Sequence, residues 1–123
     1  MGEKGFDIYD RAFQLAVRTA KIIDQLPLTQ TTREYSKQLI RASGSIGANL
    51  EEADGALTRK DFINKIGISR REARESRHWL KLLEATVNCA NKTIEDEMRW
   101  LINESKESML ILSGIIKNTK DSA

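Results

Sequence analysis

The chain has 123 residues, of which 40% are hydrophobic and 31% are charged, and its net charge is +2. This length suits one domain, and the high charge content suits long amphipathic helices. No apolar run approaches the length of a membrane span, we recognise no secretory signal, and the small net charge alone implies no polyanionic partner. Cys89 is the single cysteine, which excludes an internal disulfide, so we expect a cytoplasmic protein without a membrane partner.

Apolar residues recur at alternating spacings of four and three along nearly the whole chain, as is typical of helices in a bundle. The pattern predicts helices at about residues 6–25, 31–57, 59–87 and 93–117, with a fraying polar tail from Lys117. Capping motifs are expected at Thr31 with Glu34, Thr58 with Asp61, and Thr93 with Asp96. Short turns then predict one all-α domain over residues 1–123, an antiparallel up-down-up-down four-helix bundle.

The second predicted helix contains Gly44, Gly47 and Gly55, although each interior glycine costs a helix about 1 kcal/mol relative to alanine. We therefore expect this helix to approach another helix closely or to bend. The third helix would permit close approach, because the middle of its apolar seam is small: Ser69, Ala73 and Ser76. A polar line on the second helix is expected to form a buried hydrogen-bond network that sets helix register: Gln38, Ser45, Asn49 and Glu52.

The third helix separates its charges onto two flanks. The basic residues are Arg59, Arg70, Arg74, Arg77 and Lys81, extended outward by Lys60, Arg71 and His78. The opposite flank carries Asp61, Glu72 and Glu75 with Ile68, Trp79 and Leu82. Three interpretations stay open: a stripe that binds the phosphates of a nucleic acid, a head-to-tail contact between copies that closes into a ring, and a solvated helix stabilised by its own Glu–Arg pairs.

Two apolar features lie beside the predicted core. Trp79 and Leu82 would form an interface patch if exposed, or the bundle curls around them. The first helix has a second apolar stripe that widens its buried face, either inside the bundle or between subunits: Tyr9, Phe13, Val17 and Ala20.

No set of residues indicates catalysis. Glu51, Glu52 and Asp54 suggest a carboxylate-metal site, but a diiron bundle needs Glu-x-x-His motifs, and the sole histidine, His78, is in none. The G-x-x-G from Gly44 to Gly47 lacks the flanking strands of a KH domain. We therefore expect no enzyme activity, no metal and no cofactor, and keep a metal or hydrolytic site near Glu52 as the third function hypothesis.

Five residues resemble a family signature. Ser45-Ile46, Asn49-Leu50 and Glu52 match the S-I-x-x-N-I-x-E-G pattern of the bacterial four-helix-bundle family that includes proteins encoded in 23S rRNA intervening sequences, also called the S23 ribosomal protein family. The third helix resembles the K-I-x-I-A-x-x-E-A-R-E-x-x-x-W-L-x-L-L block of one branch, through Lys65–Ile68, Glu72–Glu75 and Trp79–Leu83. The chain departs from the family at Ala53, usually Gly, and at Ser69, usually Ala.

This resemblance covers about residues 6–116 and implies an antiparallel four-helix bundle that assembles into a ring, a homopentamer. A related accessory protein of diversity-generating retroelements binds nucleic acid and a reverse transcriptase through such a ring. The resemblance implies no enzyme activity. Together with the residue pattern it leads to a non-enzymatic protein that contacts structured RNA or a nucleic-acid complex through the basic third helix; the alternative is a protein-interaction scaffold.

Overall fold

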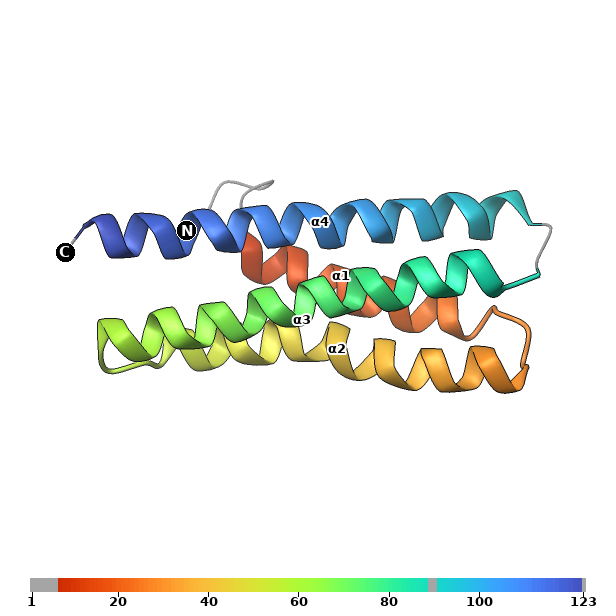
Figure 1. The fold of residues 1–123 in the computed structure, drawn as a ribbon, viewed down its shortest axis with the longest axis horizontal. Helices are drawn as coiled ribbons and strands as arrows, with labels where there is room; N and C mark the ends of the chain where they lie inside the picture. The colour runs from red at the N-terminus through yellow and green to blue at the C-terminus, as the bar shows by residue number, and fades with distance from the viewer. Residues whose placement is uncertain (1–6, 89–90, 123) are drawn as a thin grey trace.

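The computed structural model describes residues 7–88 and 91–122, which form α1 (Ile8–Ile23), α2 (Gln30–Asp54), α3 (Arg59–Thr86) and α4 (Lys92–Asp121). The predicted all-α, four-helix fold is confirmed. Consecutive helices run in opposite directions along one long axis (Figure 1). The start predicted near residue 6 and the cysteine at position 89 lie outside the described residues.

Two of the predicted helix caps are wrong. Thr29 precedes α2 and its hydroxyl accepts a hydrogen bond from the backbone N–H three residues on, at 3.1 Å. Asn91 caps α4 in the same way, also at 3.1 Å. Both caps have extended backbone, which aims the side chain at the free N–H groups, whereas Thr31 and Thr93 already lie inside helices.

The other helix ends show where the sequence pattern holds and where it fails. Thr58 caps α3 as predicted, because its hydroxyl accepts from the Asp61 N–H at 3.0 Å. Gly55 ends α2 earlier than predicted and donates its N–H to the Glu51 carbonyl. The predicted fraying from Lys117 is wrong: α4 continues to Asp121, which pairs with Lys117 at 3.6 Å.

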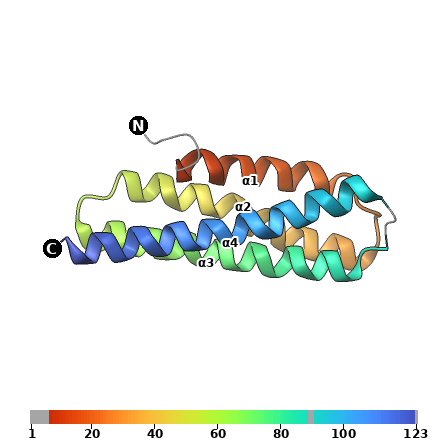
Figure 2. The same ribbon diagram turned by 90° about the horizontal axis from the view of Figure 1, so that it is seen from above.

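The helices pack pairwise around one core, α1 on α2, α2 on α3, α3 on α4, and α4 on α1. The face between α1 and α2 therefore lies opposite the face between α3 and α4, and Figure 2 shows α4 lying along α3. The core consists largely of leucine and isoleucine. It also contains fully buried small polar side chains: Thr19, Ser69, Ser76, Ser105 and Ser108.

The small seam of α3 lies against α2, as expected. Ser69 is fully buried and its hydroxyl donates to the backbone carbonyl of Ile46 at 2.8 Å, so a side chain of one helix reaches the backbone of the other. Gly47 faces α1 instead, where an added Cβ would lie 4.0 Å from the Cβ of Ala12. Gly44 is exposed with nothing within 4 Å of such a Cβ, so the packing role predicted for it is wrong.

The polar line of α2 does not form the expected buried network. The Ser45 hydroxyl donates to the Arg41 carbonyl at 2.8 Å, and the Asn49 amide donates to the Ser45 carbonyl at 2.9 Å. Gln38 accepts from the Arg41 guanidinium at 2.7 Å, and Glu52 is exposed. All three bonds lie within α2, because serine and asparagine readily bond the carbonyl one turn back, so they set no register between helices.

We expect Ser69→Ala to lower the free energy of unfolding by about 1 kcal/mol, the usual net contribution of one hydrogen bond. Ser69→Leu should cost about 1–3 kcal/mol, because extra methylene groups must force α2 and α3 apart. Urea denaturation followed by circular dichroism measures both. Ser45→Ala is the control, since its hydroxyl bonds only its own helix; equal losses at positions 45 and 69 would contradict this account.

Candidate nucleic-acid interface

The packing of α3 between α2 and α4 decides where its two charged flanks lie. Arg70 reaches α4, where its Nη1 donates to the Ser113 hydroxyl at 3.3 Å. Trp79 reaches α2, where its ring centroid lies 5.8 Å from that of Tyr35. The basic flank therefore borders α4, and the flank that carries the acidic residues borders α2.

Four of the seven predicted nucleic-acid-binding residues lie together on this basic flank: Arg70, Arg74, Arg77 and Lys81. A shallow hollow of about 470 Å³ is lined by Arg74, Arg77, His78, Lys81 and Leu82. Arg77 is half-buried, and its Nε is enclosed without a hydrogen-bond partner. Within residues 7–88 and 91–122, no carboxylate forms an ion pair with any of these four cations, so their charge is available to an external anion.

The other three predicted residues lie apart from this cluster. Arg59 and Lys60 are the first two residues of α3, exposed and about 15 Å along the helix from Arg70 at 1.5 Å per residue. Arg71 is exposed and lies 3.9 Å from the neighbouring Glu72 carboxylate. They widen the basic surface without joining its centre.

The acidic flank is partly buried where it meets α2. Burial raises the pKa of the half-buried Glu72, and the nearby Glu75 carboxylate raises it further. Arg71 and Arg41 act in the opposite direction. Of Glu72 and Glu75, only Glu75 is exposed, so a partner could reach Glu75 more easily.

Trp79 and Leu82 do not form one exposed patch. Trp79 is half-buried, packs against the core and contacts Tyr35, which is the arrangement in which the bundle covers it. Leu82 lies in the hollow with the basic residues, because its position on the helix is between the two flanks.

Lys106 of α4 is a candidate that the sequence pattern did not single out. It is exposed and lies midway between Arg99 and Ser113, which contact Glu84 and Arg70 of α3 respectively. Lys106 is therefore on the side of α4 that borders the basic flank. The seven-residue spacing of these three positions indicates from the sequence that they share one face of α4. Which helix that face borders is known only from the structure.

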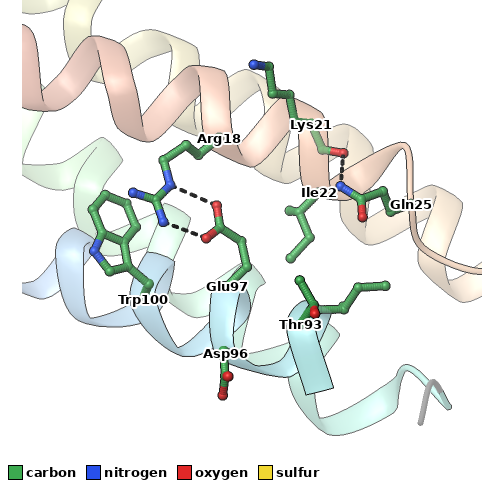
Figure 3. A pocket seen from close by; sticks show the side chains of 9 residues that line it. Arg18, Lys21, Ile22, Gln25, Thr93, Asp96, Glu97 and Trp100 are labelled. Atoms are coloured by element: carbon green, nitrogen blue, oxygen red, sulfur yellow. Dashed lines mark hydrogen bonds and ion pairs between the residues drawn. The ribbon is translucent and has the colours of Figure 1, made fainter. Parts of the chain in front are cut away.

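A second hollow, of about 530 Å³, lies between α1 and α4 (Figure 3). Arg18 forms two hydrogen bonds with Glu97, at 2.8 and 2.5 Å, and its Cζ lies 3.4 Å from the centroid of the Trp100 ring. The guanidinium thus occupies the indole face and the carboxylate that a ligand would use. Lys21 and Asp96 point away from this pair in opposite directions, so no set of free groups converges here.

The face between α1 and α2 is apolar and exposed. Phe13 is 64% exposed and Ile40 is 50% exposed. Beside Phe13, a hollow of about 200 Å³ is lined by Tyr9, Ala12, Phe13, Ala16, Gly44, Gly47, Ala48 and Glu51. The second apolar stripe of the first helix thus lies largely outside the core.

One end of this apolar face is acidic. Burial raises the pKa of Tyr9, and the nearby carboxylates of Asp54, Glu51 and Asp7 raise it further. A partner that covers Phe13 would therefore meet negative charge beside it.

No group of three or more histidine, aspartate or glutamate side chains among the described residues is placed to hold a metal. Within the same residues, no helix is long and apolar enough to cross a membrane.

Residues 4–114 match the model of the 23S rRNA-intervening sequence protein family, so the chain belongs to that family. A crystal structure of a protein of unknown function from the S23 ribosomal protein family of Bacteroides thetaiotaomicron is similar, with 34% identity and a TM-score of 0.75. The similarity covers 89% of this chain and 98% of that one. No curated protein matches the sequence.

Glu97→Gln should lower the free energy of unfolding at pH 7 by about 1 kcal/mol. This loss is smaller than for a buried ion pair, because solvent screens the partly exposed pair of Arg18 and Glu97. The Arg18 hydrogen bonds hold the pKa of Glu97 below its usual value, so the stabilisation is present at neutral pH and is lost as pH falls through that lowered pKa. Melting curves from pH 7 to about pH 3 should show the variant and the wild type converging. Glu52→Gln is the exposed control, and a gap that persists in acid would contradict the assignment.

Proposed function

We propose that this chain is a non-enzymatic binding protein of the cytoplasm whose α3 basic flank contacts the phosphates of structured RNA. The observation that carries the proposal is a group of four cations that have no carboxylate partner in the described residues: Arg70, Arg74, Arg77 and Lys81. The arginines of α1, in contrast, are paired: Arg11 with Glu104 and Arg18 with Glu97. A helix that served only to pack would not need to keep four cations unpaired on one flank.

RNA as the polyanion is suggested by the resemblance to a nucleic-acid-binding accessory protein, whereas the family description refers to the 23S rRNA intervening sequence in which such proteins are encoded. The basic flank suits a phosphate backbone because its side chains follow one helix at steps of three and four residues, about 4.5–6 Å of rise. Arginine also forms forked hydrogen bonds with phosphate oxygens.

We further propose that copies assemble head to tail into a ring, with the apolar α1–α2 face as one side of the contact. An exposed phenylalanine beside a line of small residues is suited to insertion of a neighbouring surface. A contact between two different faces is heterologous, and such contacts form a ring when the rotation between successive copies closes. The number five comes from the family resemblance alone.

The alternative function is a protein-interaction scaffold without nucleic-acid binding. It is favoured by the acidic end of the α1–α2 face, where Glu51 and Asp54 lie, because this charge complements the basic flank on the opposite side of the bundle. In that arrangement the basic flank of each copy is covered by the acidic end of the next.

We expect replacement of Arg70, Arg74 and Arg77 by alanine to weaken RNA binding about a hundredfold at 0.1 M salt. The reason is counterion release: each lost phosphate contact removes about 0.7–0.9 from the slope of log affinity against log salt, so three remove about 2–3. Fluorescence anisotropy with a structured RNA at several salt concentrations measures both quantities.

The matched control removes three cations from α2, Arg33, Lys37 and Arg41, which are exposed. It should leave the slope within about one unit of wild type. Equal effects of the two triple variants would show binding by net charge alone. If the α3 variant dissociates the oligomer and wild type binds no RNA, the scaffold function stands instead.

Phe13→Glu should dissociate the assembly, because it places a charge in the apolar contact next to existing carboxylates. Light scattering coupled to size exclusion measures the mass. Leu57→Glu is the control: Leu57 is 96% exposed, outside the α1–α2 hollow. A variant at position 13 with the wild-type mass would exclude this face as the contact.

A further inference from the structure

We infer that the surface where α3 borders α4 binds an unpaired stretch of RNA, with phosphates between Arg77 and Lys106 and a base against His78 and Leu82. This inference rests on the proposed function. It adds Lys106 of α4 as a phosphate contact and His78 and Leu82 as base contacts, and it specifies that the RNA is unpaired.

The register between α3 and α4 places the two cations at the same level of the two helices. Arg70 bonds Ser113 at one point, and Glu84 bonds Arg99 two heptads further along, in the antiparallel sense. Position 77 lies midway between the two α3 residues, and position 106 lies midway between their α4 partners. Arg77 and Lys106 therefore lie at the same level along the border between α3 and α4.

No described carboxylate compensates these charges at that point. The acidic residues in the middle of α4 act on α1: Glu104 bonds Arg11 at 2.8 Å, and Glu107 contributes to raising the pKa of Arg11. On α3, Glu72 and Glu75 belong to the flank that borders α2. Two like charges facing each other repel, so a bound anion between them would relieve the repulsion.

Arg77 also lines the adjoining hollow. Its Nε is enclosed by the protein and donates to no acceptor in residues 7–88 and 91–122. An external phosphate would therefore be bound by other atoms of the guanidinium, which can form charge-assisted hydrogen bonds with phosphate oxygens.

The hollow also offers a surface for a base. His78 is exposed, its ring lies 5.0 Å from that of Trp79 in an edge arrangement, and Leu82 lines the same hollow. A duplex hides the faces of its bases in the stack, whereas a single strand presents both base faces and phosphates. Cations beside an aromatic and an apolar side chain thus favour unpaired RNA.

The test is a fluorescence-anisotropy titration of the full chain with a 12-nucleotide unpaired RNA and with a blunt RNA duplex of the same length. Wild type should bind the unpaired RNA about tenfold more tightly, since one stacked base contributes on that scale. Lys106→Ala should weaken this binding about fourfold at 0.15 M salt, as expected for one lost phosphate contact on a single strand. His78→Ala should remove most of the preference while leaving duplex affinity unchanged.

Lys37→Ala removes one exposed lysine from α2 and should match wild type, and thermal melting establishes that every variant is folded. The inference is overturned if Lys106→Ala and Lys37→Ala bind alike, or if wild type binds both RNAs equally. Those results leave the proposed function intact when the triple α3 variant still loses duplex binding. Wild type that binds neither RNA at low salt overturns the proposed function itself.

Discussion

The close approach of α2 and α3 is the constraint on which the rest of this structure depends. A fully buried serine hydroxyl reaches the backbone of the opposite helix, which requires small side chains along the shared seam. With that seam in place, the rotation of α3 about its axis is set. This rotation decides whether each residue beside the seam faces α2 or α4, and therefore which helix each charged flank borders.

That rotation explains why the arginines of this bundle have different roles. Arg11 and Arg18 of α1 face carboxylates of α4 at hydrogen-bond distance and stabilise the contact between the two helices. Arg77 of α3 borders the other side of α4, where these carboxylates do not lie because they face α1. The same residue type is structural on one side of α4 and available for binding on the other, because α4 presents acidic groups to one neighbour and a lysine to the other.

The two open faces of the bundle lie opposite each other and differ in character. One is apolar with an acidic end, and the other is basic. Opposite faces would let a subunit contact a neighbouring copy and a polyanion at the same time, so the proposed assembly and the proposed RNA binding are compatible. They also explain the scaffold alternative, since the same charges are complementary between copies.

The sequence by itself determined the number and type of the elements and the buried seam of each helix, because hydrophobic periodicity and helix caps act within one or two turns. It also separated basic from acidic positions on α3, since 3.6 residues per turn fixes their angular order. Local signals misplaced the caps at Thr29 and Asn91, where several candidates stand side by side. Only the tertiary structure decided that Arg77 lacks an acceptor, that Lys106 lies across from it, and that Glu97 neutralises Arg18. Those properties depend on contacts between residues far apart in the chain, which arise from the packing of whole helices.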